Sequence, residues 1–183
     1  MLYLAEYIST TSKEDKITEH ELGRQLLRQG LEQEYGQIWE VYVEEKKKPV
    51  LKDAEGICFN ISHTKGLVAC GISRLEIGVD VERIRKFKEA LVRKVCSEKE
   101  QKYVFAGKDD QEKATRFCKL WTLKESYIKA IGKGLAFPLD KITFEIIGDE
   151  ICSNIPGWRY EQFEYGKEYI IAVCYQYTER GNV

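Results

Sequence analysis

Short segments in which apolar and polar residues alternate run along the first part of the chain, and such alternation is typical of strands. These segments cover 2–9, 38–45, 57–62 and 67–73. Between the first two segments, the leucines that recur at helical spacing are Leu22, Leu26, Leu27 and Leu31. Thr18 and Glu21 have the spacing of a capping box, so the pattern predicts a helix that begins there and ends near Tyr35.

The second part of the chain opens with another strand pattern at 76–84 and then changes to helical spacing. The helical segments expected are 87–97, a helix with a capping box at Ser97 and Glu100, and a long helix over about 110–131. Gly132 and Gly134 would end the long helix, because glycine readily adopts the left-handed conformation of a helix stop. The remaining strands expected are 141–147, 158–165 and 168–177.

The two parts follow the same order of elements, which is one strand, then helical segments, then three strands. The repeat is one of element order alone, because the letters themselves do not repeat. It predicts an α+β fold with two pseudo-symmetric lobes, each a helix packed on an antiparallel sheet. We expect the lobes to cover 1–76 and 77–183, with a ligand site in the cleft between them.

The composition limits the classes of function. The 183 residues carry 29 basic and 30 acidic side chains, so the charge offers no general attraction to nucleic acid or to an anionic membrane. No apolar run approaches the ~20 residues of a membrane span, and the N-terminus lacks the pattern of a signal peptide. The six cysteines form no C-x-x-C motif, which favours buried thiols over a zinc site. We expect a cytoplasmic protein with no nucleic-acid or membrane partner.

Two carboxylates stand close together in the strand G-V-D-V-E-R-I-R at 78–85. Side chains alternate along a strand, so Asp80 and Glu82 share one face while Val79 and Val81 take the other. Two such anions repel each other unless water, a basic group or a metal ion neutralises them. A solvent-facing edge strand is the ordinary alternative, and the neighbouring motifs decide between the two interpretations.

A third carboxylate, Glu125, lies in the segment W-T-L-K-E-S-Y-I-K at 121–129. Lys124 stands beside it, and Lys129 follows one helical turn later. A Glu and a Lys four positions apart usually form a surface salt bridge worth ~0.2–0.5 kcal/mol. The apolar residues of the same segment predict a largely buried helix, so we expect its charged face to border something specific.

Further polar candidates lie earlier in the chain, at Lys48 before a proline and at Ser62 and His63 where a strand enters a turn. No later histidine is present to act as a base, so a serine hydrolase is excluded. The glycine motifs of P-loop and dinucleotide-binding proteins are absent. Same-face carboxylates with lysines around them suit a hard cation such as Mg²⁺ together with a polyphosphate.

Three blocks together resemble the surfactin-synthetase-activator (Sfp-like) class of 4'-phosphopantetheinyl transferases. They are F-N-I-S-H at 59–63, G-V-D-V-E at 78–82 and W-T-L-K-E-S-Y-I-K at 121–129. Each block alone is a weak signal, whereas their order and spacing together are specific. The resemblance runs from Lys48 and Pro49 to the segment I-I-A-V-C near the C-terminus. It implies two pseudo-symmetric lobes with the active site in the cleft between them, and a chain long enough to act as a monomer.

The resemblance also implies an activity. The 4'-phosphopantetheine arm of coenzyme A would be transferred to a serine of an apo acyl or peptidyl carrier protein, with Mg²⁺ required and 3',5'-ADP released. Asp80, Glu82 and Glu125 would bind the metal ion. Glu125 and Lys129 would be the catalytic residues, and either Glu125 or a metal-bound water would take the proton of the serine hydroxyl.

The same resemblance implies contacts to coenzyme A. Lys129 and Lys124 would offset charge on the diphosphate. Lys48, Ser62 and His63 would contact the nucleotide end, including its 3'-phosphate.

The chain departs from the class at its N-terminus, where members commonly carry a longer segment with basic residues for the 3'-phosphate. The short stretch before the first predicted helix offers only Lys13 and Lys16. We therefore expect binding of coenzyme A to rest more on Lys48 and His63.

Two alternatives to the transferase stay open. One is a Mg²⁺-dependent hydrolase of nucleotide diphosphates that uses the same carboxylates. The other is a non-catalytic binder of coenzyme A or of a carrier protein, and the intact D-x-E and K-E-x-x-x-K motifs count against it. For a transferase, the carrier protein is expected to contact surface loops and an apolar patch that includes Phe87, Tyr103 or Phe105.

Overall fold

The structure, a computed structural model, describes residues 1–44, 47–134 and 137–177. The elements of the first half are β1 (Leu2–Glu6), α1 (Ser12–Tyr35), β2 (Val41–Tyr42), β3 (Val50–Leu51), β4 (Cys58–Thr64) and β5 (Leu67–Ser73). Those of the second half are β6 (Ile77–Arg83), α2 (Glu89–Val95), α3 (Glu98–Phe105), α4 (Asp110–Ala130), the 3₁₀ turn η2 (Leu139–Lys141), β7 (Phe144–Ile147), β8 (Glu150–Ser153), β9 (Trp158–Tyr165) and β10 (Tyr169–Gln176). Both halves thus run from a strand through helix to a two-stranded ribbon and two final strands.

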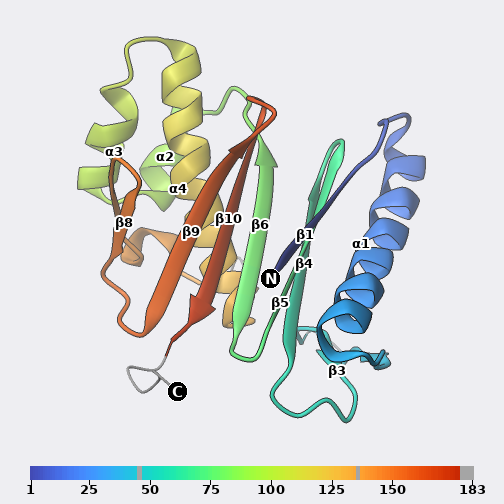
Figure 1. Cartoon of the computed structure of the whole chain (residues 1–183). Helices are drawn as coiled ribbons and strands as arrows, with labels where there is room; N and C mark the ends of the chain where they lie inside the picture. Colours follow the sequence, from blue (N-terminus) through green and yellow to red (C-terminus); the bar gives the residue numbers. More distant parts are fainter. Residues whose placement is uncertain (45–46, 135–136, 178–183) are drawn as a thin grey trace.

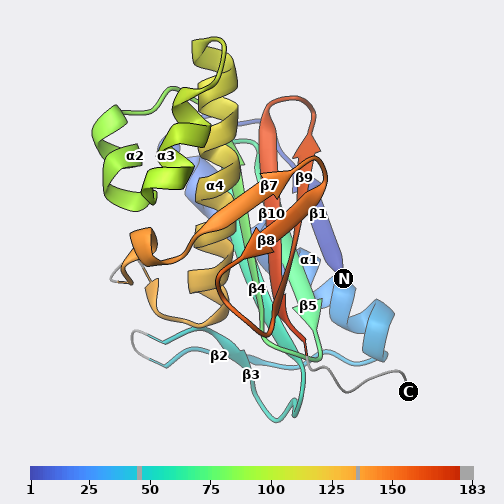
Figure 2. The same cartoon turned by 90° about the vertical axis from the view of Figure 1, so that its left-hand side faces the viewer.

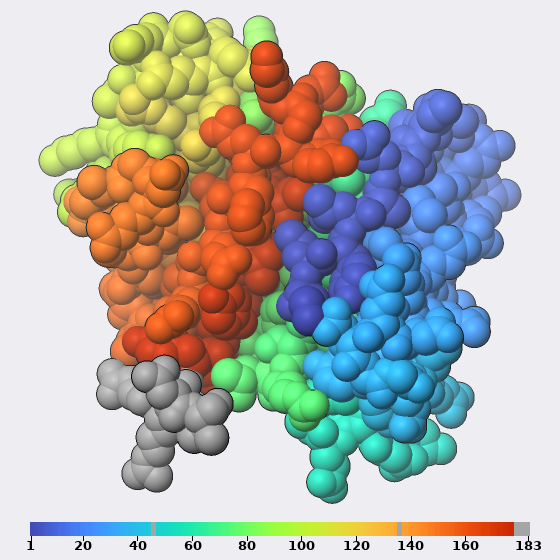
Figure 3. All heavy atoms as spheres, in the orientation of Figure 1, coloured from blue at the N-terminus to red at the C-terminus, as the bar shows by residue number. Residues whose placement is uncertain are grey.

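Each half builds one antiparallel sheet of three strands. The strand orders are β1-β5-β4 and β6-β10-β9, and they are equivalent position by position. Helix α1 lies on the outer side of the first sheet, and α2, α3 and α4 lie on the outer side of the second (Figure 1). The ribbon of β7 and β8 sits beside α4 (Figure 2), and the two halves are in direct contact on the face seen in Figure 3. The predicted α+β class, with antiparallel sheets covered by helices, is confirmed.

The core is divided by the alternation of side chains along the strands. On β5, Val68, Cys70 and Ile72 pack in the apolar cluster under α1, whereas Leu67 and Ala69 belong to a cluster shared with the second sheet. All five side chains are buried. The molecule therefore has four layers, in which a helix covers each outer face and apolar side chains fill the space between the sheets.

The strand β6 shows the same division. Val79 and Val81 are buried in the cluster between the sheets. The alternate residues Gly78, Asp80 and Glu82 face α4 instead, as the contacts described below show. The predicted sharing of one face by Asp80 and Glu82 is therefore present.

Strands β4 and β6 stand at neighbouring edges of the two sheets and are joined by side chains rather than by a backbone ladder. The Asn60 side-chain oxygen accepts a hydrogen bond from the Val79 amide at 2.8 Å, and Ser62 Oγ accepts one from the Val81 amide at 3.2 Å. Part of the F-N-I-S-H block thus has a structural function, because it holds the halves together next to Asp80.

The predicted start of the first helix is wrong. Helix α1 begins at Ser12, and its N-cap is Thr11, whose side chain accepts a hydrogen bond from the Glu14 amide at 3.3 Å. Thr18 lies inside the helix, because Thr11 already caps the helix seven residues earlier. The capping box predicted at Thr18 and Glu21 therefore does not form.

The strand predicted over 38–45 is also wrong for most of its length. Only Val41–Tyr42 forms a strand, and it pairs with β3 in a separate ribbon. Val41, Tyr42 and Val43 are exposed, so the alternating pattern does not mark a face buried in the main sheet. The end of the prediction, residue 45, lies outside the described residues.

Two further predicted features are confirmed. The capping box of α3 forms, with the Ser97 amide donating to Glu100 Oε2 at 2.7 Å. Helix α4 ends at Ala130, and Gly132 follows with a φ of 66°.

The expectation of buried thiols holds for four of the six cysteines. Cys70, Cys96, Cys118 and Cys174 are buried, whereas Cys58 is half-buried and Cys152 is exposed. None of the helices within the described ranges has the length and apolar character needed to cross a membrane.

Candidate active site

Strand β6 and helix α4 approach each other most closely at Gly78. A Cβ atom at this position would lie 1.9 Å from the Ser126 carbonyl oxygen and 2.5 Å from the Ala130 amide nitrogen. Only glycine fits such a contact between two backbones. The close approach brings the next residues on the same face of β6, Asp80 and Glu82, against α4.

Asp80, Ser62 and Lys129 form a hydrogen-bonded cluster between β6, β4 and α4. Lys129 Nζ donates to Asp80 Oδ1 at 2.6 Å and to Ser62 Oγ at 2.8 Å. Ser62 Oγ also lies 3.2 Å from Asp80 Oδ1. Asp80 and Ser62 are buried, whereas 29% of the Lys129 side chain is exposed. The cluster therefore keeps an ammonium group at the border of the site, where a ligand can reach it.

Three carboxyl groups influence one another at this place. Burial raises the pKa of Glu125 to about 7, and the negative charge of Asp80 adds to the shift. Burial also raises the pKa of Asp80, against the opposing charge of Lys129. The pKa of Glu82 is raised by burial and then by Asp80. Asp80, Glu82 and Glu125 thus lie within electrostatic reach of one another.

The chemistry of the donor set suits a hard cation, although the side chains as they lie are not gathered around one point. Among the side-chain atoms in the described ranges, the buried oxygens Asp80 Oδ2 and Glu125 Oε1 have no hydrogen-bond partner. Such oxygens are costly to bury alone, and Mg²⁺ prefers oxygen ligands of this kind. As the side chains lie, no group of three or more His, Cys, Asp or Glu residues in the described part of the chain could hold a metal ion. The cationic partner of Asp80 in this arrangement is Lys129.

Glu82 lies where the site opens into a pocket. Its Oε1 accepts a hydrogen bond from Trp121 Nε1 at 3.3 Å, and its Oε2 lies 3.7 Å from an Arg85 nitrogen. The pocket next to it measures about 480 Å³. Apolar and basic side chains line it together, including Phe87, Leu91, Phe117, Trp121, Arg83, Arg85, Lys86 and Lys88.

The apolar patch expected for a carrier protein is divided in the structure. Phe87 lines the pocket beside Glu82. Tyr103 and Phe105 lie on α3, where the guanidinium groups of Arg116 and Arg93 stand 5.0 and 5.4 Å from their ring centroids. Of the three aromatic residues, Phe87 is the one that borders the carboxylate site.

The expected contact of Lys48 with the nucleotide end of coenzyme A stays a prediction, and the structure shows this lysine between β6 and α4. Its ammonium group donates to Glu76 Oε2 at 2.8 Å, to the Ile77 carbonyl at 2.9 Å and to the Ala130 carbonyl at 3.1 Å. An ammonium group has three donors, so all of them join the start of β6 to the end of α4. In this arrangement Lys48 has a structural function.

His63 lies on the opposite side of β4 from Ser62, because neighbouring residues of a strand face opposite ways. Its Nδ1 lies 2.9 Å from Glu19 Oε2 of α1, and Glu19 Oε1 accepts a hydrogen bond from the Tyr7 hydroxyl at 2.6 Å. The His63 side chain is 54% exposed, so a ligand can reach it. The structure therefore brings Ser62 to the Asp80 cluster and leaves His63 outside it.

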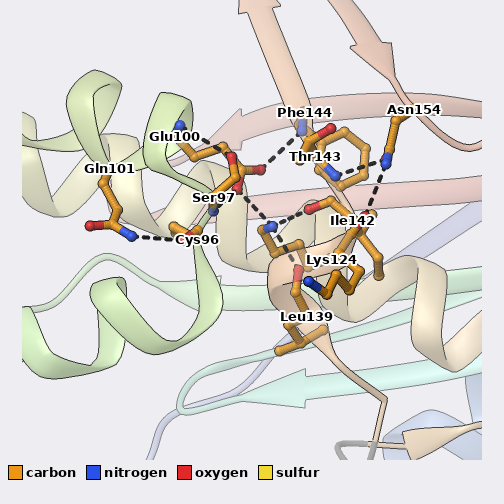
Figure 4. A network of polar contacts seen from close by, with 11 residues as sticks. Cys96, Ser97, Glu100, Gln101, Lys124, Leu139, Ile142, Thr143, Phe144 and Asn154 are labelled. Carbon is orange, nitrogen blue, oxygen red and sulfur yellow. Dashed lines mark hydrogen bonds and ion pairs between the residues drawn. The ribbon is translucent and has the colours of Figure 1, made fainter.

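Lys124 is not available to a diphosphate, so the role expected for it is wrong. Its side chain is fully buried, and its ammonium group donates to Glu100 Oε2 and to the Leu139 carbonyl, both at 2.9 Å, and to the Ile142 carbonyl (Figure 4). These acceptors use all three donors. Lys124 also leaves α4 on a different face from Glu125, because successive residues of a helix point about 100° apart.

Two partners of the predicted residues were missed by the sequence analysis. Trp121 contacts Glu82, and its spacing held a signal, since it stands four residues before Glu125 and so shares its face. Glu100 pairs with Lys124 across 24 residues of sequence. The capping box explained Glu100 by itself, so no local pattern indicated this second contact.

Comparisons with known proteins agree with this geometry. Residues 76–174, which include β6 and α4, match the family model described as the 4'-phosphopantetheinyl transferase superfamily. The chain is 32% identical over 136 residues to 4'-phosphopantetheinyl transferase Sfp of Bacillus subtilis (strain 168). The matched region covers 72% of this chain and 60% of that protein. The chain is also 41% identical over 85 residues to 4'-phosphopantetheinyl transferase gsp of Aneurinibacillus migulanus. That matched region covers 46% of this chain and 35% of that protein.

A solved structure, that of Thermotoga maritima holo-[acyl-carrier-protein] synthase (AcpS), superposes with a TM-score of 0.48 and 16% identity, over 59% of this chain and 66% of that chain. The chain spans about 60% of the length of the Bacillus relative that it matches. The family model matches more than half of the chain and includes the strand and the helix that carry the three carboxylates. The chain therefore belongs to the 4'-phosphopantetheinyl transferase superfamily.

Proposed function

We propose that this protein transfers the 4'-phosphopantetheine arm of coenzyme A to a serine of an apo acyl or peptidyl carrier protein and releases 3',5'-ADP. Membership of the superfamily supports this proposal. The observation that carries it is that Asp80, Glu82 and Glu125 lie within electrostatic reach of one another, with the ammonium group of Lys129 2.6 Å from Asp80. Carboxylates with a nearby lysine suit a site that handles a cation and phosphate charge together.

The proposal includes a magnesium ion held by Asp80, Glu82 and Glu125. The two buried carboxylate oxygens without a partner support this ligand set. When bound, the ion would supply electrostatic stabilisation for the negative charge on the diphosphate oxygens.

Lys129 supplies positive charge from the protein itself. Its ammonium group now donates to Asp80 and Ser62, and its partial exposure allows it to turn towards a phosphate group. In that position it would offset the charge that grows on the diphosphate as the bond to the leaving group breaks.

Glu125 is the proton acceptor in this proposal. The serine oxygen forms a bond to the phosphorus that bears pantetheine, the bond from that phosphorus to the bridging oxygen breaks, and 3',5'-ADP leaves with the electron pair. The serine proton passes to the Glu125 carboxylate. Without a bound cation, burial raises the pKa of Glu125 to about 7, so its carboxylate is more basic than that of an exposed glutamate.

The pocket beside Glu82 supports a place for the acceptor protein. Its apolar residue Phe87 and its basic residues Arg83 and Arg85 would suit a segment with apolar and acidic side chains. We also propose that the protein acts as a cytoplasmic monomer without a nucleic-acid partner, with lobes that divide near residues 76 and 77.

The test is the mass of a carrier protein after incubation with this protein, coenzyme A and Mg²⁺. Several apo carriers are tested. We expect at least one of them to gain the mass of one phosphopantetheine group. A carrier whose acceptor serine is changed to alanine should gain nothing. No gain with any fatty-acid, polyketide or peptide carrier would overturn the proposal, and nucleotide release without a carrier would favour the hydrolase.

Two variants and one control connect the activity to the site. Asp80→Ala and Glu125→Ala should abolish transfer while thermal unfolding shows that both variants are folded. Glu164→Gln removes an exposed carboxylate of β9 that pairs with Lys119 at 2.6 Å, and it should leave transfer unchanged. Transfer by the first two variants at the rate of the unchanged protein would contradict the proposed roles.

A further inference from the structure

A buried ion pair lies beside the carboxylate site, on another face of α4. Lys124 Nζ stands 2.9 Å from Glu100 Oε2, and neither side chain has exposed surface. Glu100 Oε2 also accepts a hydrogen bond from the Ser97 amide at 2.7 Å, and its Oε1 accepts one from the Phe144 amide at 2.9 Å. With the two carbonyl groups that Lys124 contacts, the network has a partner for each of its charged groups (Figure 4).

This network connects four separate segments. Glu100 stands in the first turn of α3, Lys124 in α4, Leu139 at the start of η2 and Phe144 at the start of β7. Each contact is made by a fully buried group, so each one limits how α4 can rotate or slide against its neighbours.

The anchored residue directly precedes Glu125. On the side of α4 that faces β6, the close contact of Gly78 with Ser126 and Ala130 holds the helix. On another side, the Lys124 network holds it. Glu125 stands between these two attachments, so a rotation of α4 would move its carboxyl group relative to Asp80.

Stability alone does not account for a charged pair at this position. The ammonium and carboxylate groups lose their water on burial, and replacing such a pair by apolar side chains of similar size is often neutral or stabilising. Leu139, Ile142 and Phe144, whose backbone groups contact the pair, belong to a buried apolar cluster that would accept apolar side chains. Directed hydrogen bonds fix the relative orientation of the groups they join, whereas apolar contacts do not.

We propose that Lys124 and Glu100 are positioning residues that hold α4 so that the Glu125 carboxyl group meets Asp80 and Glu82 in the arrangement the transfer needs. This inference rests on the proposed function. Neither residue touches the carboxylate site itself, and each acts through the orientation of α4.

The test uses the double variant Lys124→Met/Glu100→Met, which removes both charges and leaves neither unpaired. The matched control is Lys99→Gln/Glu145→Gln, because Lys99 and Glu145 form an exposed ion pair of 2.6 Å between α3 and β7, two of the four segments that the buried network connects. Each protein is measured in three ways: thermal unfolding, Mn²⁺ binding by electron paramagnetic resonance without a carrier, and the kcat and KM of transfer.

We expect the folded double variant to bind Mn²⁺ about 10- to 100-fold more weakly and to lose a similar factor in kcat, with the control unchanged. A second variant, Lys124→Met alone, removes the ammonium group and leaves Glu100 with its hydrogen bonds from the Ser97 and Phe144 amides. It should show losses of the same kind.

A folded variant with the Mn²⁺ affinity and kcat of the unchanged protein would overturn this inference and leave the proposed function standing. Failure of both variants to fold would also overturn it, because the pair would then be needed for the fold alone. If the protein without substitutions shows no transfer activity, the proposed function is overturned, and this inference is overturned with it.

Discussion

The contact between β6 and α4 makes Gly78 the position where one added methyl group perturbs the site most. A Cβ there would lie 1.9 Å from the Ser126 carbonyl oxygen, whereas ordinary contacts begin at 3.4 Å. The backbones must therefore separate by about 1.5 Å, the difference between these distances. A misplacement of about 1 Å can lower a rate about 100-fold, so we expect Gly78→Ala to lose at least this factor in transfer.

The same substitution should lower stability. Overpacking costs about 1–3 kcal/mol, and each kcal/mol lowers the unfolding temperature of a protein of this size by about 2–4 °C. The expected fall is thus about 2–12 °C. The assay measures transfer by mass spectrometry at a temperature where thermal unfolding shows that the variant is folded.

Gly71→Ala is the matched control, because Gly71 is also a glycine inside a strand. The nearest atoms to its added Cβ would be side-chain atoms, 2.5 Å away at Val79 Cγ2 and 2.9 Å away at Ile77 Cδ1. We expect it to lose stability but to keep its rate per folded molecule. Equal losses of rate in the two variants, or no loss in Gly78→Ala, would refute the reasoning.

Three further predictions concern the site and the junction of the halves. Lys129→Ala should lower the transfer rate by about 100-fold or more, since it removes the ammonium group beside Asp80. Without divalent cations, the free energy of unfolding should fall as the pH rises from 4.5 to about 7. The reason is the raised pKa of Glu125, which lets the folded protein keep a proton that the unfolded chain has lost. Glu125→Gln should reduce this fall. Asn60→Ala should cost about 1–3 kcal/mol in thermal unfolding, because the buried Val79 amide loses its acceptor.

Each of these predictions has an outcome that contradicts it. A Lys129→Ala variant with an unchanged rate would mean that this ammonium group does not reach the diphosphate. An unfolding temperature that falls equally with pH in Glu125→Gln would assign the titration to another group. For Asn60, the control is Asn154→Ala, whose bond to the Thr143 amide is exposed, and an equal loss in the two variants would contradict the buried junction.

Periodicity was sufficient where one strong local pattern decided the structure. The long helical segment predicted over 110–131 matches α4 to within one residue, and the Ser97 capping box formed as expected. The first helix begins earlier than predicted, because Thr11 offers a cap in front of a polar segment that no apolar stripe marks. The segment at 38–45 failed for a related reason, since alternation cannot reveal whether a strand is buried in the main sheet or exposed in a ribbon.

The candidate site was predictable only in part. The same-face placement of Asp80 and Glu82 follows from strand geometry, and it is present against α4. The contacts of Lys48 and Lys124 within the protein were not predictable, because their acceptors are carbonyl and carboxylate groups distant in sequence. A lysine beside a carboxylate motif looks the same in sequence whether its ammonium group faces a ligand or closes a buried network.

The central claim is that Asp80, Glu82 and Glu125 together hold a cation for the diphosphate of coenzyme A. The most direct measurement is the anomalous scattering of Mn²⁺ in crystals grown with coenzyme A. We predict one peak bounded by carboxylate oxygens of all three residues, with the diphosphate on the same ion and the Lys129 ammonium group turned towards it. A Mn²⁺ ion bound to coenzyme A without contact to Glu125, or bound at another place, would contradict the account.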